Sequence, residues 1–329
     1  MSQILYAVPS RFTGYSLGLR SGKGNPGGGI STKVHRVCEV WREYYDVNMT
    51  DRFWEYPSCH TLVMDPLTVS LSENPVECLE NYAAYTCKIK VLYCSEQALL
   101  LLPFEIREGL IKASTVVTHS CDFQRVQFDM LGYPTVPLCD PIPPVFLDRG
   151  SKKELEVLGI GNISYEKNVA ELIEVFRLLR LRGVATTYVG GSNLWGETNS
   201  ESLRLEIELR KYCSNFYRNV SQDGVVSALR RASCGVFLTK HETCSESNQE
   251  CLMAGLLNFY GGHRLWLERP GVHDLGSAEE VVDAISRVTH GFSKIPAEAL
   301  RCEAEDWAVR NCSYEQFLNQ WKEVMNYAL

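Results

Sequence analysis

The feature that most constrains the fold is an alternation of strand-like and helix-like segments along nearly the whole chain. This alternation is typical of parallel α/β layers, because parallel strands need long crossover connections that helices usually provide. In the first half, strands are predicted at residues 4–8, 45–49, 61–64, 89–93 and 115–119. Helical patterns separate them at residues 30–44, 75–86, 97–111 and 121–131.

A proline-rich segment at residues 137–144 interrupts the alternation and excludes a helix or an interior strand there. A charged segment follows, and we interpret residues 149–153 as a linker. The alternation then resumes, with strands predicted at residues 155–160, 186–189, 234–238 and 257–260. After the first of these, an apolar stripe at helical spacing predicts a helix. The stripe consists of Val169, Leu172, Ile173, Phe176 and Leu179.

The whole pattern predicts an α/β protein of two doubly wound, Rossmann-like domains that face each other across a cleft. A length of 329 residues agrees with this, because single cores rarely grow beyond about 300 residues. We expect a first domain at residues 1–148 and a second at residues 154–308. The final segment, residues 309–329, is predicted to be a helix that crosses back onto the first domain, with Phe317, Trp321, Val324 and Met325 on roughly one face. A helix that only caps the second domain is the alternative.

Composition places the chain among ordinary globular proteins, with 45% hydrophobic and 22% charged residues. The sequence runs from Met1 into a strand-like segment without a signal-peptide pattern, and its longest apolar stretch, residues 98–104, is too short to span a bilayer. Thirteen cysteines include no C-x-x-C pair, so neither a disulfide framework nor a zinc site is indicated. We expect a cytoplasmic protein, with a peripheral position at a membrane left open.

Two acidic residues, Glu242 and Glu250, stand just after the predicted strand at residues 234–238. Open α/β sheets bind ligands at the carboxyl ends of their strands, and helix amides there can face an anion. A nucleotide sugar fits this arrangement, because it has hydroxyls at both ends and a diphosphate between them. A structural interpretation stays open, since residues 247–250 also match a capping box in which Glu250 reaches back to the cap amide.

Two glycine-containing motifs precede the acid pair: GIGNISYEKN at residues 159–168 and VGGS at residues 189–192. In this order and spacing, the three motifs resemble the family-four retaining glycosyltransferases of the two-Rossmann (GT-B) architecture. The resemblance implies transfer of a sugar from a nucleoside-diphosphate sugar to an acceptor hydroxyl, with retention at the anomeric carbon and without a cofactor. It also implies roles for three residues: Lys167 would neutralise the diphosphate, Glu242 would bind hydroxyls of the donor sugar, and Glu250 would hold the ribose.

Further donor contacts are implied by the resemblance at two glycine turns, at the loop after the first strand of the second domain and at the start of a helix. These residues are Gly28, Gly29, Gly190, Gly191, Asn162 and Ser245. Glu96 is the candidate for touching the transferred sugar. A plain turn explains either glycine pair equally well, and His119 fits a structural role as well as a site role. The chain has no Asp-x-Asp motif, so we expect no metal.

One departure from the family is Asn162, which stands where the family usually has an arginine that contacts the diphosphate. Either a cation of the first domain substitutes, with Arg20, Lys23 and Lys33 as candidates, or turnover is impaired. A nucleotide-sugar-binding protein that does not transfer is therefore an alternative.

The charge distribution bears on the acceptor. The chain carries a net charge of -7, but the first 42 residues hold six basic residues against one acidic residue. In the GT-B architecture the first domain binds the acceptor, so a basic segment there favours an anionic one. Candidates are a lipid phosphate, a phosphate-bearing glycan, or DNA with hydroxymethylated bases, as for viral glycosyltransferases. The same charges would equally suit the donor diphosphate or a solvated face.

Overall fold

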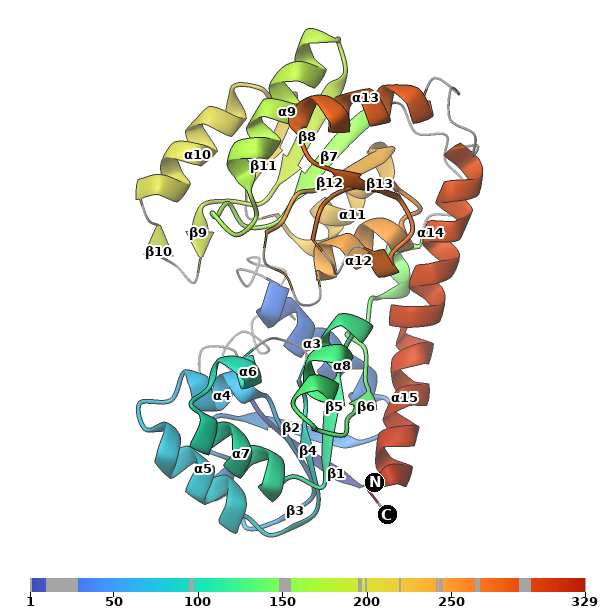
Figure 1. Cartoon of the computed structure of the whole chain (residues 1–329). Helices are drawn as coiled ribbons and strands as arrows, with labels where there is room; N and C mark the ends of the chain where they lie inside the picture. The colour runs from blue at the N-terminus through green and yellow to red at the C-terminus, as the bar shows by residue number, and fades with distance from the viewer. Residues whose placement is uncertain are drawn as a thin grey trace. The chain divides into compact units, whose positions relative to one another are not determined.

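The computed structural model describes residues 2–9, 29–94, 98–147, 155–194, 197–198, 200–218, 220–240, 242, 245–263, 267–289 and 297–328. The chain forms two compact units. The first comprises Met1–Ser21, Lys33–Pro141 and Tyr314–Leu329, and the second comprises Gly22–Thr32 and Ile142–Ser313. Each unit contains a parallel six-stranded sheet with helices packed on it, as Figure 1 shows. The linker expected at residues 149–153 lies outside the described residues.

The sheet of the first unit has the strand order β2-β1-β3-β4-β5-β6. Its strands are β1 (Gln3–Ala7), β2 (Asp46–Thr50), β3 (Cys59–Met64), β4 (Cys87–Leu92), β5 (Val116–His119) and β6 (Val136–Pro137). All five strands predicted for this half are present, displaced by a few residues at their ends. β6 is an additional edge strand, which is the position in a sheet where a proline is tolerated.

The helices of the first unit follow the predicted order with one exception. They are α3 (Gly29–Arg42), α4 (Pro66–Ser70), α5 (Pro75–Ala84), α6 (Ala98–Leu101), α7 (Phe104–Ala113) and α8 (Asp122–Met130), with one 3-10 turn, η2 (Phe53–Glu55). The single helix predicted at residues 97–111 is wrong, because the chain breaks into α6 and α7. Pro103 occupies the N-cap of α7, where its missing N–H is not needed, and it could not continue α6.

Alternate residues of the first sheet face different helices. Leu5, Leu62 and Leu92 are buried in one apolar core with residues of α5 and α7. Tyr6, one position after Leu5, instead contacts Trp41 of α3, with ring centroids 5.4 Å apart. The last helix, α15 (Tyr314–Tyr327), packs on the same side, and the Trp321 ring lies 4.7 Å from that of Trp41. The prediction that the C-terminal helix returns to the first domain is therefore confirmed, and Figure 1 shows α15 beside β6.

The sheet of the second unit has the order β11-β8-β7-β12-β13-β14. Its strands are β7 (Glu156–Ile160), β8 (Ala185–Val189), β11 (Asn215–Tyr217), β12 (Cys234–Phe237), β13 (Leu257–Gly261) and β14 (Val272–Leu275), and β9 (Asn193–Leu194) and β10 (Glu197–Thr198) form a small antiparallel pair. The four predicted strands are confirmed. The sequence analysis missed β11 and β14, which are short, mostly half-buried edge strands without a continuous apolar run.

Helices of the second unit connect these parallel strands. They are α9 (Val169–Leu181), α10 (Ser200–Arg210), α11 (Gln222–Arg231), α12 (Glu246–Met253), α13 (Ala278–Thr289) and α14 (Ala297–Cys312), with one 3-10 turn, η3 (Pro144–Phe146). Four of the five residues of the predicted stripe of α9 are buried and Ile173 is half-buried; Val169, Phe176 and Leu179 lie in the core with Val157 of β7. The apolar periodicity thus determined which face of α9 packs on the sheet.

The described part of the chain bears on disulfide bonds and on membrane-spanning helices. The twelve cysteines found there are all free, and Cys38, Cys94, Cys234 and Cys251 are buried in apolar surroundings. None of the described helices has the length and apolarity needed to cross a membrane.

Candidate active site

The candidate site is organised by the topology of the second sheet. β7 pairs with β8 on one side and with β12 on the other, so the strand order reverses around β7. Ligands of open α/β sheets bind at such a reversal, beyond the carboxyl ends of the strands. The loops that follow β7, β8, β11 and β12 all start from this edge, because the strands are parallel.

Lys167 and Glu242 meet at this edge. Lys167 belongs to the loop between β7 and α9, and its ammonium forms an ion pair and hydrogen bond with the Glu242 carboxylate from the loop after β12. The side chain of Glu242 is 11% exposed and that of Lys167 is 30% exposed, so the pair is largely shielded while the lysine still reaches solvent. The sequence named both residues, and the fold brings them together across 75 positions.

Two contacts next to this pair hold the same loops together. The backbone N–H of Lys240 donates to the carbonyl of Glu166 at 2.8 Å. The Lys240 ammonium also lies 4.3 Å from the centre of the Tyr165 ring, a distance suited to a cation–π contact. The position of Glu242 relative to Lys167 is thus supported by neighbouring backbone and side-chain contacts.

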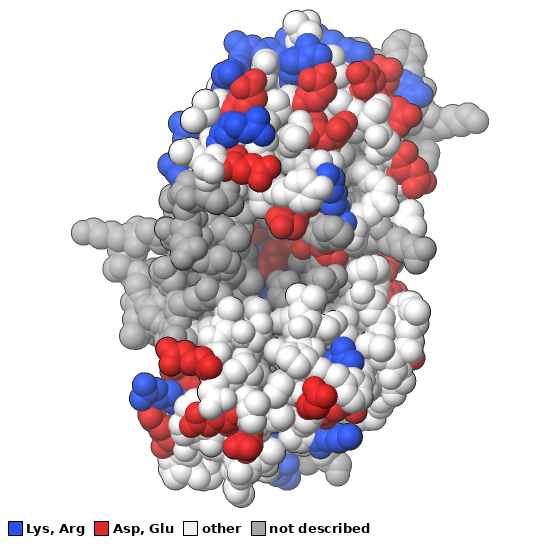
Figure 2. All heavy atoms as spheres, turned by 60° about the vertical axis from the view of Figure 1, so that its left-hand side comes forward, with Lys and Arg blue, Asp and Glu red and all other residues white. Residues whose placement is uncertain are grey.

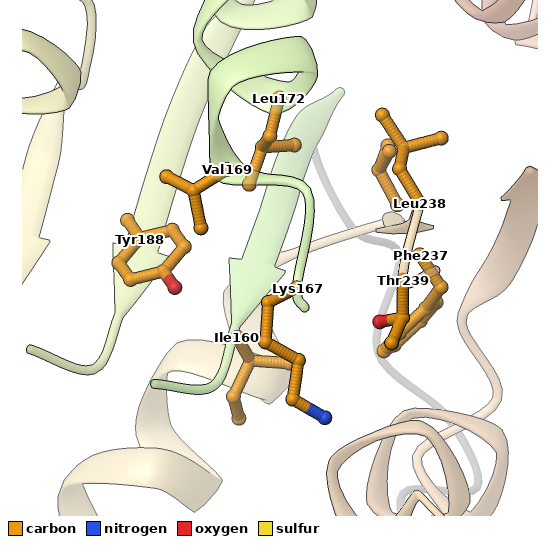
Figure 3. A pocket seen from close by; sticks show the side chains of 9 residues that line it. Ile160, Lys167, Val169, Leu172, Tyr188, Phe237, Leu238 and Thr239 are labelled. Carbon is orange, nitrogen blue, oxygen red and sulfur yellow. The ribbon is translucent and has the colours of Figure 1, made fainter. Parts of the chain in front are cut away.

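A pocket lies beneath Lys167, with walls from β7, α9, β8 and the end of β12. Figure 3 shows the Lys167 side chain running past Ile160, with its amine directed away from Leu172, and Thr239 on the opposite wall. The walls are mainly apolar, and Lys167 supplies a positive charge. A low-dielectric wall next to a cation strengthens its attraction for an anion.

Glu250 lies on α12, which follows the same strand as Glu242, and is 7% exposed. The capping-box interpretation of Glu250 is wrong. The N-cap is Ser245, whose hydroxyl accepts from the backbone N–H of Asn248 at 3.4 Å, and Glu250 stands well inside the helix. The capping box therefore does not account for the burial of Glu250.

The N-terminus of α12 is anchored by residues that the sequence analysis did not identify. The Arg269 guanidinium donates to the side-chain oxygen of Asn248 and, at 3.4 Å, to the carbonyl of Ser245. The amide nitrogen of Asn248 donates to the Tyr260 hydroxyl at 3.1 Å. Arg269 follows β13 by sequence, but only the fold places it at the helix start. This anchoring fixes the direction of Glu250.

Gly190 and Gly191 form the turn after β8, directly against the turn after β7. Gly190 has φ 147°, and a Cβ there would lie 1.8 Å from the carbonyl oxygen of Gly161. The N–H of Ile163 donates to the carbonyl of Gly191 at 3.0 Å, which holds Asn162 beside this turn. The plain structural interpretation therefore accounts for Gly190, because a side chain would separate the two turns.

A charged cluster adjoins this turn and was absent from the sequence predictions. Glu206 of α10 is buried and accepts from the backbone N–H of Ser192 at 2.9 Å. Arg210 donates to it at 2.8 Å, and Arg218, directly after β11, forms an ion pair with it at 3.6 Å. Burial raises the pKa of Glu206, but the hydrogen bonds from Ser192 and the charge of Arg218 hold that pKa below its ordinary value. Glu206 is therefore ionised at neutral pH.

Several site candidates from the first half of the chain are either untested or explained by a structural role. Gly28, Glu96, Arg20 and Lys23 lie outside the described residues, and Gly29 is the first residue of α3. His119 is buried, with Nδ1 2.9 Å from the Thr135 hydroxyl; burial and, next, the charge of Arg125 lower its pKa. These surroundings fit the structural interpretation of His119.

The basic segment is also less exposed than the charge count implied. Lys33 and Arg36 are buried on α3, whereas Arg42 is exposed. Lys33 lies near the buried Asp65. Burial raises the pKa of Asp65, and the charge of Lys33 only partly opposes this rise. Arg36 is therefore not part of an exposed basic surface, and the role of Lys33 as a donor cation stays a prediction. On the face seen in Figure 2, the lysines and arginines of the first unit, below, lie among acidic residues.

Comparisons with solved structures identify the fold. Sucrose-phosphate synthase from Thermosynechococcus elongatus matches with a TM-score of 0.73 at 12% identity, over 99% of this chain and 98% of that one. HepE from Anabaena, in complex with UDP-glucose, matches with a TM-score of 0.67 at 10% identity, over 99% and 100% of the two chains. An α-glucosyltransferase in complex with UDP-glucose and DNA containing an abasic site matches at 0.60 and 11% identity, over 98% of each chain. No protein-family model and no curated protein sequence matches the chain. The chain has the GT-B fold predicted from its sequence.

Proposed function

We propose that this protein is a retaining glycosyltransferase that moves a sugar from a nucleoside-diphosphate sugar to an acceptor hydroxyl. The observation that carries the proposal is the Lys167–Glu242 pair at the strand-order reversal of the second sheet. Related folds with UDP or UDP-glucose bound support it, because they show that this architecture accommodates such donors. The domain boundaries predicted from the sequence remain part of this proposal.

The chemistry required for transfer matches these residues. Departure of a nucleoside diphosphate builds negative charge, which Lys167 would stabilise. Glu242 would accept hydrogen bonds from hydroxyls of the sugar, since a carboxylate has several acceptor sites. Glu250, buried on an anchored helix, would bind the ribose hydroxyls of the nucleotide. Ser245 would contribute only as the cap that orients this helix.

The proposal extends to the stereochemistry of transfer. In a front-face displacement the leaving phosphate helps to deprotonate the acceptor hydroxyl while the glycosidic bond breaks. The protein then supplies position and charge stabilisation rather than a nucleophile. We propose retention on this basis, and transfer without a metal ion because Lys167 carries the charge role.

A thermal-shift screen of nucleoside-diphosphate sugars tests the proposal. A ligand at a hundred times its dissociation constant adds about 2.7 kcal/mol to the stability of the folded state, which gives a clear rise in Tm. We expect one nucleotide family to stabilise the protein, and Lys167→Ala to remove most of that shift. If no nucleotide sugar at millimolar concentration shifts Tm, the proposal is wrong.

Two other functions stay under consideration. A DNA glycosyltransferase is favoured by the similarity to the DNA-bound α-glucosyltransferase, although the burial of Lys33 and Arg36 weakens the electrostatic argument for it. A nucleotide-sugar-binding protein without transfer activity is favoured by Asn162. Slow hydrolysis of the donor in the absence of acceptor separates these cases, because a binding protein would leave the donor intact.

A further inference from the structure

In the proposed donor site, Lys167 alone does not compensate the negative charge of a nucleoside diphosphate. A nucleoside diphosphate carries at least two negative charges, whereas the charge of Lys167 is compensated by Glu242 in the ligand-free protein. Asn162, in the same loop, offers an amide and no charge. Lys33, proposed from the sequence as a substitute cation, is buried in the first unit. A positive group on the second unit, close to the loop of Asn162, would complete the site.

Arg218 has that location. It follows β11 directly, so it stands at the same edge of the sheet as the loops of Lys167 and Gly190. Its side chain packs against Gly191: a Cβ on Gly191 would lie 3.0 Å from Cγ and 3.3 Å from Nε of the arginine. The carbonyl of Gly191 in turn accepts from Ile163, the residue after Asn162. Arg218 thus lies across the turn that adjoins Asn162, and glycine at position 191 leaves room for it.

The surroundings of Arg218 hold its guanidinium in place. Nη2 donates to the Ser192 hydroxyl at 3.3 Å, and Nε lies 3.6 Å from the carboxylate of Glu206. Glu206 is shared with Arg210, so two guanidinium groups face this carboxylate. The Arg218 side chain is 35% exposed while that of Glu206 is 3% exposed. The positive partner therefore reaches solvent and the negative one does not.

We propose that Arg218 binds the diphosphate of the donor and supplies the charge that Asn162 does not. The inference rests on the proposed function, because it names a further residue of the same donor site. A guanidinium suits this role, since its planar N–H groups match the oxygens of a phosphate and remain charged at any physiological pH. Glu206 acts as a positioning residue that orients Arg218 from the buried side of the pair.

The test is a titration series that adds one phosphate at a time. ADP, CDP, GDP and UDP are screened first, and the tightest binder is compared with its monophosphate and its nucleoside by isothermal titration calorimetry. For Arg218→Gln we expect the diphosphate affinity to fall about tenfold or more, as for loss of a charged hydrogen bond. The nucleoside affinity stays at the wild-type value, so the ratio of the two affinities shrinks. Arg218→Lys keeps the positive charge but lacks the planar set of N–H donors, so it should show a smaller loss of diphosphate affinity than Arg218→Gln.

Arg204→Gln is the matched control, because Arg204 is an exposed arginine of α10 in the same unit. We expect it to leave the ratio of diphosphate to nucleoside affinity unchanged. The inference is overturned if Arg218→Gln keeps the wild-type ratio, if it lowers Tm without changing the ratio, or if it weakens the nucleoside as much as the diphosphate, which would indicate contact with the base. These outcomes leave the proposed function intact. If wild-type protein binds none of the four diphosphates, both proposals fail together.

Discussion

Lys167 and Glu242 compensate each other's charge in the ligand-free protein. A diphosphate that approaches Lys167 must therefore share the ammonium with Glu242, and the sugar hydroxyls would offer Glu242 new partners. The two halves of the donor thus act on the two ends of one ion pair. Substitution of Glu242 should consequently separate binding of the phosphates from transfer of the sugar.

We predict that Glu242→Gln lowers the rate of transfer, or of donor hydrolysis, by about a hundredfold or more, as for loss of a preorganised polar contact. Affinity for the nucleoside diphosphate should equal or exceed that of the wild type, because Lys167 loses its competing carboxylate. Initial rates and calorimetric titration measure the two effects. Glu201→Gln, at an exposed carboxylate of α10, is the control and should change neither. Equal losses of rate and of diphosphate affinity would place Glu242 outside the sugar site.

Glu250 gives a second prediction at this scale. Glu250→Ala should weaken binding of both the nucleoside diphosphate and the nucleotide sugar by about 1 to 3 kcal/mol, the range for a charged hydrogen bond. Tm should change little, because the cap of α12 depends on Ser245. Ser245→Ala provides the comparison and should lower stability by about 1 kcal/mol. Unchanged nucleotide affinity in Glu250→Ala would exclude the ribose contact.

At the scale of elements, the strand-to-helix turns of the second unit form one interlocked edge. The turns after β7 and β8 are joined by hydrogen bonds from Gly161 to Val189 and from Ile163 to Gly191, both 3.0 Å long. The N–H of Gly190 donates to Tyr217 of β11 at 2.9 Å, which ties in a third strand end. Loops held in this way can present Asn162, Lys167 and Arg218 in fixed positions.

This arrangement predicts different outcomes for two glycine substitutions. Gly190→Ala should destabilise the protein by about 3 kcal/mol or more, because both the positive φ and the clash with Gly161 oppose it. Gly161→Ala should lower the free energy of unfolding by only about 1 to 2 kcal/mol. Gly161 also has a positive φ, 137°, but no atom lies within 4 Å of the added Cβ. Urea unfolding followed by circular dichroism measures both. Similar losses in the two variants would contradict the close contact of the turns.

For the whole molecule, the chain leaves the first unit after Pro141 and returns to it at Tyr314. The return is secured by α15, whose Phe317 and Trp321 contact Trp41 of α3. All three rings are fully buried, so the last residues of the chain complete the interior of a unit formed mainly by its first half.

Trp321→Ala should therefore destabilise the first unit by about 3 to 5 kcal/mol, the usual cost of removing a large aromatic side chain from a core. Differential scanning calorimetry should show a lower transition temperature for that unit. Lys322→Ala, at the exposed neighbouring position, is the control and should unfold as the wild type does. An unchanged thermogram for Trp321→Ala would mean that α15 does not stabilise the unit.

The acceptor also belongs to this scale, because its recognition depends on a summed surface charge. If the acceptor is a polyanion, its affinity should fall steeply between about 50 and 200 mM salt, while donor affinity falls less. Arg42→Gln should flatten that dependence, whereas Arg36 cannot be used because it is buried. Acceptor affinity that does not depend on ionic strength would eliminate nucleic acid and favour a neutral saccharide.

The fold class, most of the strands and the return of the last helix could be predicted from local patterns in the sequence. Apolar periodicity specifies which face of an element is buried, and that information is local to each segment. The apolar stripe of α9 and the prolines of residues 137–144 are examples. Lys167, Glu242 and Glu250 were also identified from local sequence, but through the motifs in which they stand and not through apolar periodicity.

Which of these polar residues meet, and which are buried, depends on how the folded chain packs. Lys33 and Arg36 count as surface charges in a sequence but lie in the interior, because α3 packs that face on the sheet. Arg218 follows a short edge strand without an apolar signal, yet parallel pairing brings it to the turn beside Asn162. The capping box at residues 247–250 was excluded only when the N-cap was found at Ser245. Charge and hydrogen bonding depend on distances between segments remote in sequence, and these distances are set by how the sheets and helices pack.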